Sequence, residues 1–336
     1  MTSGQPLRIA SIGAGGWGVH VASQVLGDDR ASLVALADVS EESRTRAGAE
    51  LGVPAEMRFE DPGELLETTD LDAVIVTTPH ALHYDHVSAA MDRGLHVYCE
   101  KPFTTDVDDA RDLVRRAEAR SEVTMVGFQR HHEQPYLAAR ERTRDAAPSL
   151  ITAEITQDWI ENFRTTWRAN PDLSGGGQLY DTGSHLVDVV LWLADARPTS
   201  VSAEMVFDDA EQRVDVQALL SIRFDSGAVA NVTVSGDSAT VREHVHVWTE
   251  EGATYVDGRG WTERSLRVVD PENTTSQPLV TEAETRGKME AFVDAIVGGE
   301  SPPVTVRHGF YVTAVLEAAY ESARDEGRRV AIDLDA

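Results

Sequence analysis

Residues 7–38, which read LRIASIGAGGWGVHVASQVLGDDRASLVALAD, decide the fold of this chain. An apolar run over 7–12 breaks into the turn Gly13-Ala14-Gly15-Gly16-Trp17-Gly18, and a helix-compatible segment connects this turn to a second apolar run over 33–37. Asp38 ends that second run, twenty positions after the last glycine. A G-x-G-x-x-G turn between a strand and a helix, with an acid at the end of the next strand, is the setting in which this motif binds a dinucleotide.

Each part of the motif has a physical role in that setting. The first glycine allows the tight turn, the second lets backbone approach a pyrophosphate, and the third lets helix and strand pack closely. The phosphates then face the positive end of a helix. An ordinary strand–turn–helix is the alternative, but the strand, helix and acid all favour a dinucleotide site. Asp38 is expected to bind the adenosine ribose, which favours NAD over NADP because a 2′-phosphate would meet a like charge.

The length of 336 residues predicts two domains, which we place at 1–128 and 129–336. No run approaches the roughly eighteen apolar residues of a membrane span, and the first residues show no signal-peptide pattern, so a cytoplasmic protein is expected. Cys99 is the only cysteine, which excludes a disulfide within the chain and a zinc cluster made of cysteines.

The charge balance is strongly acidic. Asp and Glu total 57 against 30 Lys and Arg, a formal charge of −27, and only Lys101 and Lys288 among the basic residues are lysines. The electrostatic field of so negative a protein repels nucleic acid and anionic membranes, so neither is an expected partner. The acids are spread along the chain, and an acidic, lysine-poor surface suits concentrated salt, where self-repulsion is screened. We interpret it as a halophile's surface; the alternative is a moderately acidic mesophilic enzyme encoded by GC-rich DNA.

Strands and helices alternate over the first half, which predicts a doubly wound parallel sheet. The β-rich run 73–78, with no polar alternation, is typical of a strand buried on both faces. The second half predicts an α/β domain whose open sheet, over 201–269, is largely antiparallel, and two closing helices near 284–297 and 307–323. A ligand should lie beyond the carboxyl ends of the first sheet's strands, where four residues fall: Gly13, Pro79, Glu100 and Gln129.

Lys101 is the first candidate for chemistry. It directly follows a predicted strand at the cofactor end of the sheet and precedes Pro102. Because cis peptide bonds are nearly confined to X-Pro, a cis turn here would aim the ammonium into the cleft. The alternative is a lysine on a surface loop.

Asp181 and His185 are the second candidates. At i and i+4 they share a face of a predicted helix over 179–194, directly after a triple glycine. A histidine can take a proton near neutral pH, and a carboxylate can orient it. The spacing equally allows both side chains to be solvated while the apolar side of the helix packs on the core.

The spacing of other histidines resembles that of metal ligands, but it does not predict a metal site. His80, His83 and His86 recur every three residues and diverge around a helix, while His131 and His132 are adjacent. Converging ligands are required of a metal site, so we expect no metal, and a mixture of solvated and cleft-lining histidines.

Beyond single residues, a set of ordered motifs resembles the glucose–fructose oxidoreductase / inositol dehydrogenase (Gfo/Idh/MocA) family over residues 7 to about 195. The motifs are the glycine turn 13–18, Thr78-Pro79-His80-Ala81-Leu82-His83, Glu100-Lys101-Pro102, Gly127-Phe128-Gln129-Arg130, Trp167-Arg168 and the stretch GGGQLYDTGSH over 175–185. The resemblance implies a Rossmann domain followed by an α/β domain whose open sheet often forms the subunit interface, hence a homodimer or homotetramer. It also implies bound NAD(P) and oxidation of a carbinol in a sugar, polyol or related compound.

The resemblance assigns roles by position. In it, His185 takes the proton of the substrate hydroxyl, Lys101 holds that hydroxyl and the nicotinamide ribose, and Asp181 binds substrate or steadies the proton relay. The implied cofactor contacts are Gly13, Gly15, Gly16, Trp17, Gly18, Asp38, Thr77, Thr78, Pro79, His83, Glu100, Lys101, Gln129, Trp167 and Arg168. The implied substrate contacts are Lys101, Trp159, Arg164, Asp181 and His185.

Three functions are compatible with these motifs. The leading one is an NAD-dependent dehydrogenase of a sugar, cyclitol or sugar derivative. The second is a glycoside hydrolase that acts by transient oxidation and regenerates its NAD⁺ in each turnover. The third is a sensor that binds NAD and sugar without catalysis, which the joint presence of Lys101, Asp181 and His185 disfavours.

Overall fold

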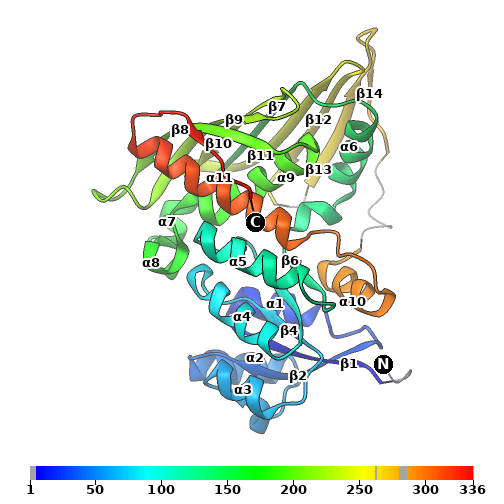
Figure 1. Cartoon of the computed structure of the whole chain (residues 1–336), viewed down its shortest axis with the longest axis vertical. Coiled ribbons are helices and arrows are strands. Elements are labelled where there is room, and N and C mark those ends of the chain that lie inside the picture. Colours follow the sequence, from blue (N-terminus) through cyan, green and yellow to red (C-terminus); the bar gives the residue numbers. More distant parts are fainter. Residues whose placement is uncertain (1–4, 262, 280–285, 336) are drawn as a thin grey trace.

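The computed structural model describes residues 5–261, 263–279 and 286–335, which form two sheets, each with its own helices. In Figure 1 the first domain lies below in blue and cyan, and the second sheet lies above in green and yellow. The long helix α11 (Val306–Arg324) lies between them, packed on both the second sheet and α5 (Val107–Glu118). The predicted α/β class, a parallel Rossmann sheet followed by a largely antiparallel one, is confirmed.

The first sheet has six parallel strands in the order β3-β2-β1-β4-β5-β6. Their bounds are Leu7–Ile12, Ala31–Ala37, Arg58–Phe59, Ala73–Val76, His96–Cys99 and Thr124–Val126 for β1 to β6. The strand order reverses between β1 and β4, so a crevice opens where their carboxyl ends diverge. Every residue of β4 is buried, as its unbroken apolar sequence predicts for a strand between two helical layers.

The connecting helices begin where the sequence supplies a cap. Ser40, Asp61 and Asp106 each accept a hydrogen bond from a backbone N–H in the first turn of α2, α3 and α5. The bounds are Gly16–Ser23, Glu41–Glu50, Pro62–Thr68 and His83–Asp92 for α1 to α4. These caps fix where each helix starts and therefore the length of the loops that face the crevice.

The second sheet has nine strands in the order β14-β13-β12-β11-β7-β10-β9-β8-β15. Among the described strands of this sheet, only the β7–β10 pair is parallel, and the other pairs are antiparallel. The bounds are Leu150–Asp158, Pro198–Phe207, Asp215–Phe224, Val229–Ser235, Asp237–Thr249, Gly252–Arg259, Glu263–Val269, Thr275–Ser276 and Val330–Ala331 for β7 to β15. Burial alternates along the central strands, as expected when helices cover one face of a sheet.

Helices of the second domain cover that face. α6 (Gln134–Asp145), α9 (Ser184–Ala194) and α11 supply its apolar side chains. The segment predicted to be helical over 179–194 is helical, but its first residues, Leu179–Gly183, form a π-helix before α9 begins. Such a turn is frequent at functional sites because it changes the direction in which side chains project. Short elements complete the domain: η3 (Gln129–His132), α7 (Trp159–Phe163), η4 (Trp167–Ala169) and α8 (Pro171–Ser174).

Helix α10 (Lys288–Gly298) returns from the second half of the chain to the first domain. Its residues Met289, Phe292 and Ile296 share one apolar cluster with Ile75 and Tyr98 of the first sheet. The division at residue 128 stays a prediction, and this helix packs across it. Residues 284 and 285, where we expected the helix to begin, lie outside the described residues. Among the described residues, no helix is both long and apolar enough to cross a membrane.

Candidate active site

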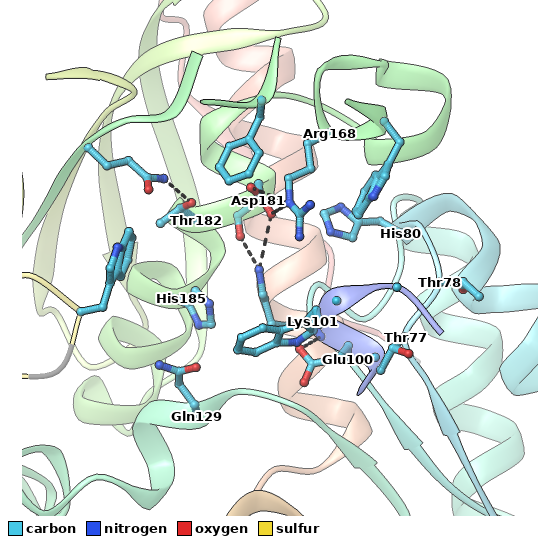
Figure 2. A pocket seen from close by; sticks show the side chains of 18 of the residues that line it. Thr77, Thr78, His80, Glu100, Lys101, Gln129, Arg168, Asp181, Thr182 and His185 are labelled. Carbon is cyan, nitrogen blue, oxygen red and sulfur yellow. Dashed lines mark hydrogen bonds and ion pairs between the residues drawn. The ribbon is translucent and has the colours of Figure 1, made fainter. Parts of the chain in front are cut away.

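A cavity of about 430 Å³ lies between the two domains, where the strand order of the first sheet reverses. Figure 2 shows side chains from both domains pointing into it. Its walls combine the glycine turn with charged, polar and aromatic residues: Gly15, Gly16, Trp17, Gly18, Thr77, Thr78, His80, Glu100, Lys101, Gln129, Arg130, Gln157, Phe163, Trp167, Arg168, Asp181, Thr182, His185 and Trp261. The predicted catalytic residues are therefore brought together, and the solvated alternatives for Lys101, Asp181 and His185 do not hold.

The glycine turn fits a pyrophosphate. Gly13 has a φ of 99°, and a Cβ there would lie 2.8 Å from the Thr77 backbone, so only glycine suits this position. A Cβ on Gly18 would strike the Gly13 carbonyl, which fixes the close contact between α1 and β1. Gly15 and Gly16 instead face open space at the N-terminus of α1, where backbone N–H groups can bind phosphate oxygens.

Asp38 lies beside that turn at the end of β2. Its carboxylate accepts hydrogen bonds from the backbone N–H groups of Ala14, at 2.7 Å, and Ser40, at 2.9 Å. Arg44, an arginine that could offset its charge, donates to the Asp38 backbone carbonyl at 2.7 Å and lies 3.6 Å from Glu60. The carboxylate is thus held beside the glycine turn at the end of β2, and Arg44 is already engaged.

Lys101 and Asp181 form the centre of the cavity. The Lys101 ammonium donates to the Asp181 backbone carbonyl at 2.6 Å and lies 3.6 Å from its Oδ1 (Figure 2). Trp159 Nε1 donates to Asp181 Oδ2 at 2.7 Å, and Arg168 Nε lies 3.3 Å from the same carboxylate. Burial alone would raise the pKa of Asp181, but Lys101 and Arg168 outweigh it and lower that pKa. Burial lowers the pKa of Lys101, which the facing carboxylates of Asp181 and Glu100 partly oppose.

His185 is placed by the first turn of α9, just after the π-helix that carries Asp181. The residue is 9% exposed, and its Nδ1 is buried with no hydrogen-bond partner among the described residues. Burial, and then the nearby cations Arg130 and Lys101, lower its pKa well below 6.5. The imidazole is therefore neutral at physiological pH and able to accept a proton.

His80 is a cavity residue that the sequence analysis did not assign to the site. Its Nδ1 lies 2.9 Å from the Ser174 backbone carbonyl, so Nδ1 carries the proton and Nε2 is left as an acceptor. Burial lowers its pKa to about 3, and its ring packs edge-on against Trp167 at 4.8 Å between centroids. The contact ties the Trp167-Arg168 segment of the second domain to the loop after β4.

Not every predicted contact lines the cavity. Trp159 is fully buried behind Asp181, and His83 bridges the backbone carbonyls of Thr78 and Pro102. Pro79 shapes the loop after β4 without lining the cavity. Arg164 lies outside, at 2.8 Å from Asp208. Besides His80, five residues line the cavity unpredicted: Gln157, Phe163, Trp261, Arg130 and Thr182. The last two are direct neighbours of the predicted residues Gln129 and Asp181.

The expectation that the remaining histidines are solvated or cleft-lining is wrong for His83, His131 and His132, which are buried and do not line the cavity. Nε2 of His131 and Nε2 of His308 lie 2.8 and 2.7 Å from Oδ1 of Asp188, whose side chain is fully buried. These rings both bond one oxygen of a buried carboxylate between α9 and α11, a partner that sequence spacing cannot show. His132 is buried beside them. The expected absence of a metal stays a prediction.

Together, the Rossmann crevice, the open glycine turn and the buried lysine–aspartate–histidine set define an NAD(P)-dependent oxidoreductase. Comparison with known protein families supports the same class of enzyme. The oxidoreductase family model with an NAD-binding Rossmann fold, GFO_IDH_MocA, matches residues 7–128, and the GFO/IDH/MocA C-terminal domain matches residues 146–255. The chain belongs to the Gfo/Idh/MocA family.

Individual relatives span nearly the whole chain. A D-xylose 1-dehydrogenase (NADP(+)) of Haloferax volcanii is 29% identical over 96% of this chain and 98% of its own length. A scyllo-inositol 2-dehydrogenase (NAD(+)) of Bacillus subtilis is 27% identical over 89% of each chain. The crystal structure of an inositol dehydrogenase homologue from Azotobacter vinelandii, complexed with NAD⁺, has a TM-score of 0.85 at 20% identity, over 97% of both chains, and shows the shared fold.

Proposed function

We propose that this enzyme oxidises a secondary or anomeric carbinol of a neutral ring sugar or cyclitol and uses NAD⁺ as the hydride acceptor. The observation that carries the proposal is the convergence of Lys101, Asp181 and His185 in one cavity beside the open glycine turn. Relatives whose names specify D-xylose and scyllo-inositol dehydrogenation support the substrate class. NADH formation with D-xylose, myo-inositol and methyl glucosides tests it.

The chain's own residues supply position and proton transfer. The neutral His185 ring accepts the hydroxyl proton, and the Lys101 ammonium stabilises the alkoxide charge that develops on the same oxygen. Asp181 holds Lys101 in place and is itself held by Trp159 and Arg168. Bound nicotinamide supplies the acceptor for the carbinol hydride. The turn at Gly15 and Gly16 would hold the pyrophosphate.

The cavity walls favour a neutral ring. Phe163, Trp167 and Trp261 offer aromatic faces, which stack well on the apolar face of a sugar. Gln157 donates its amide hydrogens to Gln178 at 2.9 Å and Thr182 at 2.6 Å, which leaves its Oε1 to accept from a hydroxyl. Arg130 and Arg168 are each paired with a carboxylate, so neither needs an anionic substrate.

We expect kcat/KM to be higher with NAD⁺ than with NADP⁺ by at least about tenfold at matched salt. A 2′-phosphate against Asp38 costs up to about 4 kcal/mol at contact with an effective dielectric near 20, and about 1.4 kcal/mol already gives tenfold. Asp38→Ala should reduce the ratio, whereas Asp70→Ala, at a side chain 96% exposed beside Arg8, should not. Equal or better turnover with NADP⁺ would contradict the assignment.

We propose further that the chain is a halophilic homo-oligomer. Its charge of −27 produces repulsion within and between subunits that salt screens over a few Å, and the Haloferax relative supports such an origin. We expect the melting temperature to rise, and the dimer or tetramer to persist, from dilute buffer to molar KCl. Thermal melts and light scattering over a salt series measure both. A monomer that melts highest in dilute buffer is the opposite result.

A further inference from the structure

Lys288, the second of the chain's two lysines, is buried against the cofactor cavity. It opens α10, and its side chain is 7% exposed. Its ammonium lies 2.5 Å from Oε1 of Glu100 and 3.3 Å from the Gly127 backbone carbonyl. A lysine this buried requires a charged partner, and the partner is the residue directly before Lys101.

The surroundings of Lys288 fix its position. The ammonium lies 5.2 Å from the ring centroid of Trp17 and 5.7 Å from that of Tyr98, both within range of a cation–π contact. Met289 and Phe292 anchor the same helix in the core of the first domain. Lys288 therefore links α10 to the glycine turn and to the end of β5.

Glu100 is the group on which this lysine acts. Tyr98 donates to its Oε1 at 2.6 Å, and the backbone N–H of Lys101 approaches its Oε2 at 3.3 Å. Burial alone would raise the pKa of Glu100, but Lys288, together with Tyr98 and Lys101, lowers that pKa and keeps the carboxyl ionised. Glu100 is thus a buried carboxylate beside Lys101, in competition with Asp181 for the same ammonium.

We propose that Lys288 is a positioning residue that neutralises Glu100, so that the Lys101 ammonium stays on Asp181 and faces the substrate. The inference rests on the proposed role of Lys101 in the reaction. Without Lys288, Glu100 loses this cationic partner, and its charge draws the Lys101 ammonium away from Asp181. Because displacements of about 1 Å at reacting groups can cost roughly 10²-fold, the loss of this one charge has a large effect.

Kinetics of four variants test the proposal. Lys288→Met should lower kcat by roughly 10²-fold, whereas Lys288→Arg, which keeps the charge, should stay within about tenfold of wild type. Lys288→Met combined with Glu100→Gln removes both charges and should recover much of the kcat lost in the single variant. Arg286→Met, which removes an exposed partner of Asp294 next to the same helix, is the control and should leave kcat unchanged.

A second measurement does not depend on activity. With only two lysines, selective ¹³C-lysine labelling gives two ε-carbon signals, which Lys288→Met assigns, and their shifts against pH report the Lys101 pKa. The charged groups that face Lys101 are Asp181, Glu100, Arg168 and Lys288, with His80 and His185 neutral. Loss of Lys288 removes a cation and frees a carboxylate, so the Lys101 pKa should rise in Lys288→Met and fall back in the double variant.

The two measurements separate the possible failures. A Lys288→Met protein with near-normal kcat and an unchanged Lys101 titration would overturn the proposal. A second result would also overturn it: kcat is lost and is not recovered in the double variant, while the Lys101 signal stays as in wild type. That pattern would indicate a purely structural role for Lys288. If the wild type oxidises no sugar or cyclitol, the proposed function fails, and the lysine titrations still decide whether Lys288 sets the state of Lys101.

Discussion

His185→Ala should lower kcat by roughly 10²- to 10⁴-fold, the range expected when a general base is removed. The neutral rings of His185 and His80 are the groups in the cavity that can take a proton, since Lys101 already bears one and the Asp181 carboxylate is held by Trp159, Arg168 and Lys101. Of the two, His185 is the residue to which we assign the role of base. Steady-state kinetics in saturating NAD⁺ and substrate measure the loss.

The pH profile identifies the base. Because the pKa of His185 is lowered well below 6.5, the wild-type rate of oxidation should rise with pH through an ionisation below that value and then level off. His185→Ala should lack this rising limb. It should still bind NAD⁺ as tightly as wild type, because the glycine turn and Asp38 lie in the first domain and His185 lies in the second. Turnover within a few-fold of wild type, with the limb intact, would make Lys101 the next candidate.

Glu243→Gln should lower the free energy of unfolding by roughly 3–5 kcal/mol, the cost of breaking a buried ion pair by removing one partner. Glu243 on β11 is 1% exposed and receives Arg130 Nε at 3.0 Å and Nη2 at 2.5 Å. Arg264 donates to it at 3.0 Å, and Tyr136 donates to it as well. The variant leaves the guanidinium groups of Arg130 and Arg264 without their shared carboxylate. Arg130 lines the cavity, and Arg264 donates to the Trp261 backbone carbonyl.

The loss of stability at acid pH should depend on the protonation of Glu243. Burial alone would raise the pKa of Glu243, but Arg130 and Arg264 lower it to about 2, below the ordinary value of 4.5. Its contribution is complete above about pH 4.5 and is lost as the pH falls toward 2. Denaturant unfolding at neutral pH should show the full loss for Glu243→Gln. Glu118→Gln, in an exposed pair with Arg307, is the matched control and should cost less than about 1 kcal/mol.

The parts of the site that depend on local sequence could be predicted. The glycine turn, Asp38 and the Lys101 loop each follow a strand of the first sheet, and parallel strands place their carboxyl ends at one edge. The helical spacing also predicted that Asp181 and His185 lie on the same side of one helix. The directions of their side chains, however, depend on a π-turn that no residue pattern predicts.

The parts that depend on long-range packing could not be predicted. Lys288 is 188 residues from Glu100 in sequence, and nothing around it indicates that α10 returns to the first domain. Trp261 reaches the cavity from the turn between β12 and β13 because Arg264 anchors that turn to Glu243. Arg164 was expected in the substrate site because of its loop, yet Asp208 on a neighbouring segment pairs with it outside the cavity.

Deuterium transfer is the most direct test of the central claim that this enzyme moves a hydride from a carbinol carbon to NAD⁺. The purified enzyme is incubated with NAD⁺ and with sugars or cyclitols deuterated at individual carbinol carbons, and product and cofactor are analysed by mass. We expect one equivalent of deuterated NADH for each oxidised product. A hydrolysed glycoside with no net NADH, or sugar binding with no deuterium transfer, would contradict it.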